Sequence, residues 1–158
     1  MIQGTLQNFI AIFKDHVTAD ADLKYFAYGE VFEVEKRIQS DASNFDTPLL
    51  WLDEPEVTPN RNRTNLYSNS FTSAVWLIVS LPSAHDYETI EAGYSEAHEL
   101  LDRVVAMLYR LQRERVLVDF KIGKEEAISR KFVRTGNLIG WRMEVSISLE
   151  TTLIHHVN

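Results

Sequence analysis

The segment DEPE (residues 53–56) holds the densest group of side chains able to do chemistry, the acid cluster Asp53, Glu54 and Glu56. Neighbouring carboxylates can act as general acid and base or bind a divalent cation. In a strand, however, Glu54 and Glu56 would share one face and Asp53 would take the other. A hydrolytic pair needs two carboxyl groups facing each other across a cleft. An active site is therefore the least favoured of three interpretations; the others are a solvated strand end and a contact with another protein.

His98 and Asp102 are the best candidates for metal ligands, because side chains at i and i+4 lie on one face of a helix. A metal site would need further ligands from elsewhere, and the alternative is the polar flank of an amphipathic helix. An enzyme that used a metal or small ligand would combine this pair with the acid cluster. His155 and His156 would point to opposite faces of a strand. His16 is expected near a helix C-terminus, where a cation is favourable.

Basic residues follow the acid cluster and recur late in the chain. With the acid cluster, five of them are candidates for an interface with another protein: Arg61, Arg63, Arg130, Lys131 and Arg134. They also raise nucleic acid as a partner. Few aromatic residues lie among the late basic ones, however, and no DNA- or RNA-binding motif is present. The sequence therefore argues against nucleic acid.

Motifs that cradle phosphate or activate a nucleophile are absent from the sequence. None of GxGxxG, GxxxxGK[ST] and GxSxG occurs, and the six glycines are scattered. The lack of cysteine excludes disulfides, thiolate zinc sites and cysteine nucleophiles. We expect no cofactor, no catalytic residues and a non-enzymatic role.

Charge is divided unevenly along the 158 residues, whose net charge is −7. Residues 1–102 contain 17 acidic and 6 basic side chains, whereas residues 103–142 contain 4 acidic and 10 basic ones. Such a division allows copies of a protein to meet head to tail, acid against base.

The length suits a single domain, residues 1–158. The N-terminus lacks the pattern of a signal peptide, and the longest apolar runs, such as AVWLIV (74–79), are too short to span a bilayer. We therefore expect a soluble cytoplasmic protein without membrane contact.

The spacing of apolar residues predicts two main helices. Apolar residues from Ile2 to Val17 recur at helical intervals and predict a helix over about residues 4–18. A longer stripe at steps of three and four predicts a second helix from about Asp86 to Arg113. Acids at its start and arginines at its end suit the helix dipole.

Strands are predicted for most of the remaining apolar segments. They are expected near Tyr25–Tyr28 and in TPLLWLDEPEV (47–57), FTSAVWLIVSL (71–81), VLVDFKIG (116–123) and WRMEVSISLETT (141–152). Residues 60–70 have the composition of a polar loop, which predicts a hairpin with a long tip. After Gly29 we expect a short helix or an irregular turn. The predicted fold is α+β: an antiparallel sheet of four to five strands with two main helices packed on one face.

The order of these elements resembles that of the tail-terminator (tail-completion) proteins of tailed phages and phage-like contractile injection particles. The resemblance covers nearly the full chain and is carried by the segments TPLLWLDEPE, SAVWLIVSLP and NLIGWRMEVSISLETT and by the single long helix. It implies an antiparallel sheet backed by helices and a hexameric ring that caps the tail tube and offers a surface to the head or connector. It brings no catalytic residues.

The same resemblance implies partners and a location. The partners would be further copies of the chain and tail-tube or head-completion proteins. The hairpin tip at residues 53–70 would be a contact element. The protein, from a phage or prophage, would lie in the cytoplasm of the bacterial host or in the assembled particle.

Overall fold

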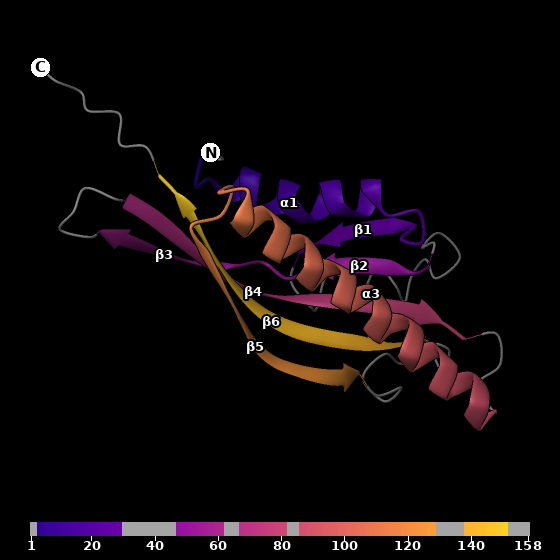
Figure 1. The fold of residues 1–158 in the computed structure, drawn as a ribbon. Coiled ribbons are helices and arrows are strands. Elements are labelled where there is room, and N and C mark those ends of the chain that lie inside the picture. Colours follow the sequence, from indigo (N-terminus) through magenta and orange to yellow (C-terminus); the bar gives the residue numbers. More distant parts are fainter. Residues whose placement is uncertain (1–2, 30–46, 62–66, 82–85, 129–137, 152–158) are drawn as a thin grey trace, which may run out of the picture.

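The computed structural model describes residues 3–29, 47–61, 67–81, 86–128 and 138–151. The elements in chain order are α1 (Leu6–Ala19), β1 (Tyr25–Tyr28), β2 (Leu49–Leu52), β3 (Glu56–Arg61), β4 (Tyr67–Ser80), α3 (Tyr87–Arg113), β5 (Asp119–Ile128) and β6 (Leu138–Glu150). These strands form one six-stranded sheet, and α1 and α3 lie over the same face of it (Figure 1). The fold is α+β.

Strand β4 is the centre of the sheet. β6 is antiparallel to it along nearly its whole length, from the pair Ser68 and Glu150 to the pair Ser80 and Leu138. The other edge of β4 is shared, with β3 beside its first half and β2 beside its second half. β5 then pairs with β6, and β1 pairs with β2. The strand order is β1-β2-β4-β6-β5, with β3 paired to β4 off this path.

The sheet differs from the prediction in two respects. It has six strands rather than four to five, and β1 runs parallel to β2. A parallel pair needs a long crossover, and 20 residues separate β1 from β2. The additional strand is β3, where Pro59 and Asn60 belong to types that are depleted in strands. Pro59 is tolerated because β3 pairs only with β4 among the described strands, and proline is confined to such edge positions.

Both predicted helices are confirmed to within two residues at each end. Each begins at a side chain that accepts a hydrogen bond from the first turn. Thr5 Oγ1 accepts from the backbone N–H of Asn8 at 3.2 Å, and Asp86 Oδ1 accepts from that of Glu88 at 3.1 Å. Of the helices in the described ranges, neither has the length and apolar composition needed to cross a membrane.

The larger apolar core joins both helices to the sheet. Phe9 of α1 stacks on Phe71 of β4 with 4.9 Å between ring centroids, and Phe13 meets Phe9 edge-on. All three rings are almost completely buried. Burial alternates along β6, as in a strand with one face on the core, since Met143 and Ile147 are buried while the residues beside them are less so.

A smaller apolar cluster lies on the opposite face of the sheet. Trp51 of β2 and Trp76 of β4 stack there with 4.7 Å between ring centroids and an interplanar angle of 18°. The other members of the cluster are Ala27, Leu49, Ala74, Ile78 and Ile128. Since Leu50 and Leu52 face the larger core, every residue of β2 is buried.

Candidate functional site

Asp53 follows the last residue of β2 and is held by β4. Its backbone N–H donates to the carbonyl of Ala74 at 3.0 Å, and its own carbonyl accepts from Ser73 Oγ at 2.6 Å. The indole N–H of Trp76 donates to Asp53 Oδ2 at 3.0 Å. The other carboxylate oxygen, Oδ1, is buried and has no hydrogen-bond partner among the described residues. The Asp53 carboxylate therefore binds to the tryptophan cluster and does not line an open cleft.

Burial raises the pKa of Asp53, and the Trp76 hydrogen bond and the positive charge of Arg142 only partly offset that effect. The folded protein therefore binds this proton more tightly than the unfolded chain does. Protonated Asp53 therefore contributes to the free energy of unfolding. This contribution is fully present at pH values below the pKa of Asp53 in the unfolded chain, and it is lost as the pH rises through the pKa of Asp53 in the folded protein.

Asp53→Asn is therefore expected to raise the melting temperature at pH 7, by about 2 °C. Asparagine mimics the protonated carboxyl and keeps an oxygen that can accept from Trp76. Thermal unfolding followed by circular dichroism at pH 7 and pH 4 should show the gain shrinking at the lower pH. Glu54→Gln, at an exposed side chain, is the matched control and should change little. A lower melting temperature for Asp53→Asn at pH 7 would contradict the assignment.

The other two residues of the acid cluster do not share the buried surroundings of Asp53. Glu54 and Glu56 are exposed, so the three carboxylates do not converge on one cleft. Arg61 ends β3, five residues beyond Glu56, which separates them by about 17 Å along the strand. The four other basic candidates lie outside the described residues: Arg63, Arg130, Lys131 and Arg134.

His98 and Asp102 do meet, as their spacing predicts. Their Nδ1 and Oδ2 atoms are 3.4 Å apart on the surface of α3, where Asp102 is exposed and His98 is partly exposed. The imidazole also contacts the Trp141 ring edge-on, with 4.9 Å between centroids. Within the described ranges no three histidine or acidic side chains gather as a possible metal site.

The alternative enzyme hypothesis requires this pair and the acid cluster to share one site. His98 lies on the helix layer, whereas the carboxylate of Asp53 bonds to Trp76 on the opposite face of the sheet. The sheet therefore separates the two groups. The structure does not assemble the proposed constellation.

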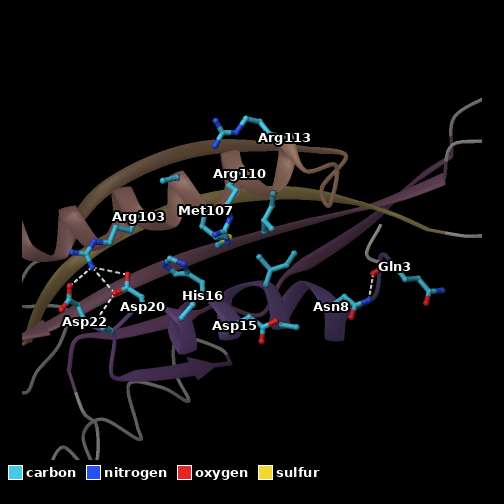
Figure 2. Close-up of a pocket in the computed structure, with 16 residues that line it drawn as sticks. Gln3, Asn8, Asp15, His16, Asp20, Asp22, Arg103, Met107, Arg110 and Arg113 are labelled. Carbon is cyan, nitrogen blue, oxygen red and sulfur yellow. Dashed lines mark hydrogen bonds and ion pairs between the residues drawn. The ribbon is translucent and has the colours of Figure 1, made fainter.

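A groove of about 1200 Å³ between α1 and α3 was not predicted from the sequence (Figure 2). Arg103 reaches across one end of it from α3. Its Nη1 donates to Asp22 Oδ2 at 2.7 Å and to Asp20 Oδ1 at 3.1 Å, and its Nη2 donates to Glu99 Oε1 at 3.4 Å. The hydrogen bonds that Arg103 donates to Asp22 and Asp20 raise the pKa of Arg103. This ion-pair network fixes the end of α1 against α3.

His16 lies in the same groove, beside this network (Figure 2). Burial lowers its pKa, with Arg110 and Arg103 acting in the same direction and Asp20 opposing them. His16 does lie in the last turn of α1, as predicted, but burial disfavours its charged form there. Its Nε2 is buried without a hydrogen-bond partner among the described residues.

The sequence carried only a weak signal for this groove. The acids of TADAD (18–22) were readable as a helix end, but their partner Arg103 lies more than eighty residues later. No periodic pattern links such distant segments. The described residues form charged and aromatic contacts at these positions, and they do not place a nucleophile beside a base.

The chain matches no protein-family model, and no curated protein is found to be similar to it.

Proposed function

We propose that this protein is a non-enzymatic structural subunit that assembles into a ring and completes or caps a phage-like tail tube. The resemblance in element order supports the tail role. The single sheet with both helices on one face agrees with the helix-backed sheet that the resemblance implies, although β1 pairs with β2 in parallel. The proposed partners are further copies of the chain and tail-tube or head-completion proteins.

The observation that carries the assembly part of the proposal is the exposed strand β3. Every residue from Glu56 to Asn60 is exposed, and Val57 retains 44% of its accessible surface. β3 pairs with β4 on one side and with no other strand in the described part of the chain. Figure 1 shows the β3–β4 hairpin extending beyond the part of the sheet that the helices cover.

An open strand edge favours association with another chain. An apolar side chain such as Val57 and charged residues at both ends of β3 give that edge the mixed character of a specific contact. These properties favour a subunit contact over a solvated strand end.

Native mass spectrometry of the purified protein tests the proposal. A closed ring should give one dominant species whose mass is a fixed multiple of 18.2 kDa, six copies in the hexameric case. Addition of tail-tube protein should produce a larger complex. A strict monomer at high concentration, with tube protein present, would refute the assembly.

Reversing the acids at the base of the hairpin, Glu54→Arg with Glu56→Arg, is expected to weaken assembly at least tenfold. Like charges placed across an interface cost one to several kcal/mol, and 1.4 kcal/mol is a factor of ten. Light scattering across a concentration series measures the midpoint. The control is Asp15→Arg with Glu125→Arg, an equal change in net charge at exposed sites on α1 and β5. Equal effects of the two variants would remove the hairpin from the interface.

A further inference from the structure

The outer face of α3, turned away from the sheet, divides into two oppositely charged halves. Residues 86–102 contain six acidic side chains and no lysine or arginine, and all six are exposed: Asp86, Glu88, Glu91, Glu96, Glu99 and Asp102. Residues 103–113 contain three arginines and no acid: Arg103, Arg110 and Arg113, which also line the groove against α1. The charge division of the whole chain is thus displayed on a single helix.

The helix dipole accounts for only part of this arrangement. The helix dipole acts only within the first and last turns, and Glu96, Glu99 and Asp102 lie beyond the first turn. Glu88 and Glu91 are three residues apart, as are Glu99 and Asp102, and like charges at that spacing destabilise a helix. Glu88 in the first turn and Arg110 and Arg113 in the last turn suit the dipole, but the acids beyond the first turn gain no such support.

Ion pairs within the chain neutralise only part of the pattern. Glu99 contacts Arg103, and Asp102 contacts His98. Among the described residues, Glu88, Glu91, Arg110 and Arg113 form no ion pair.

The two halves are also too far apart to neutralise each other. At about 1.5 Å per residue, roughly 28 Å of helix separates Glu91 from Arg110, whereas screening at physiological salt acts over about 8 Å. Both charged ends are therefore available to another molecule.

An exposed tyrosine accompanies each charged end. Tyr87, at the acidic end, is 79% exposed, and Tyr109, at the basic end, is 55% exposed. The Tyr109 ring is held edge-on against Phe120 with 4.9 Å between centroids. Tyrosine and arginine are enriched among residues that dominate interface energetics, so the basic end has the composition of a contact surface and Tyr87 offers the acidic end an aromatic anchor.

We infer that α3 forms the contact between successive copies in the ring, the acidic half of one α3 lying against the basic half of the next. The partner that binds each charged half is a second copy of this chain. The two halves have opposite charge, and in each half some charged side chains form no ion pair with the described residues of their own chain. This inference rests on the proposed ring assembly and names its surface. A head-to-tail contact of two different patches closes into a ring when the rotation between successive copies permits it.

The position of the hairpin agrees with this contact. Figure 1 shows the C-terminal, basic end of α3 on the same side of the molecule as the β3–β4 hairpin. The hairpin, with Glu54 and Glu56 at its base, would therefore meet a part of the neighbour other than the acidic half of its α3.

Two charge-reversal variants test the inference. The first is Glu88→Arg with Glu91→Arg at the acidic end, and the second is Arg110→Glu with Arg113→Glu at the basic end. Each places like charges at every contact and should weaken assembly at least tenfold, measured by native mass spectrometry and light scattering. Circular dichroism should show that both variants remain folded. Wild-type assembly should also weaken between 50 mM and 500 mM salt.

Restoration of assembly distinguishes a direct contact from a general loss of stability. A 1:1 mixture of the two variants pairs each reversed end with its complement, and so does a single chain carrying all four substitutions. Both preparations should regain the wild-type mass. The control Asp15→Arg with Glu125→Arg should assemble as the wild type does.

The outcomes separate this inference from the proposed function. A wild-type ring that survives both reversals, or a four-fold variant that stays dissociated, overturns the α3 contact and leaves the ring standing. A wild-type species of two copies overturns the head-to-tail arrangement, since an antiparallel pair of α3 helices would satisfy the same charges. A monomeric wild type overturns both.

Discussion

Replacing Trp76 with alanine is expected to lower the free energy of unfolding by about 3–5 kcal/mol, the usual cost of truncating a buried aromatic side chain. Trp76 is only 4% exposed, stacks on Trp51 and donates its indole N–H to Asp53. The truncation leaves a cavity on the face of the sheet opposite the helices and deprives a half-buried carboxylate of a donor. Domains retain about 5–15 kcal/mol in total. Urea unfolding followed by circular dichroism measures the loss.

Two further variants separate the contributions to this effect. Trp76→Phe keeps an aromatic ring but removes the indole donor, so it should cost less, about 1–2 kcal/mol. Leu6→Ala changes an apolar residue that is 43% exposed on α1 and should cost little. If Trp76→Ala cost no more than Leu6→Ala, the tryptophan cluster would not be part of the core.

Phe71→Ala is expected to cost a similar 3–5 kcal/mol, for a reason that involves a different layer. Phe71 is 1% exposed and stacks on Phe9, so its ring joins the central strand β4 to α1. The loss should be accompanied by faster amide exchange in α1, because the stack is one of the few aromatic contacts that hold this helix. Urea unfolding and hydrogen exchange together measure both effects.

A double-mutant cycle with Phe9→Ala isolates the stacking itself. Aromatic pairs of this geometry contribute about 0.5–1.5 kcal/mol beyond the area that they bury. The two single losses should therefore sum to more than the loss in the double variant. The prediction would be contradicted if the two single losses of unfolding free energy summed to the loss in the double variant and amide exchange in α1 of Phe71→Ala stayed at the wild-type rate. Other contacts would then hold the helix.

Much of the fold could be predicted from periodicity. The apolar stripes of both helices and the alternation in β6 record local geometry that repeats every few residues. The helix predicted from about Asp86 begins at Tyr87, with Asp86 as its N-terminal cap. Each of these features depends on residues that are close together in the sequence, so a short-range pattern is enough to predict it.

The features that were missed depend on pairing between distant segments. β3 is a strand because its backbone bonds to β4, despite Pro59 and a polar composition. The parallel pairing of β1 with β2 has no local signature either. At the candidate site, the sequence correctly split Asp53 from Glu54 and Glu56 but could not show Trp76 as the partner of Asp53. It also gave no indication of the groove closed by Arg103 and Asp20.

The place of β6 in the sheet has a consequence for how the protein is made. β6 lies between β4 and β5, yet it is the last of the described strands to leave the ribosome. Until residues 138–150 emerge, one edge of β4 has no partner, and its apolar residues Val75 and Leu77 lack neighbours from Met143 and Val145. Pairing of segments about 60–80 residues apart folds slowly and exposes strand edges meanwhile. Nascent chains are therefore expected to need chaperone protection, and truncation before residue 138 should yield an aggregating product.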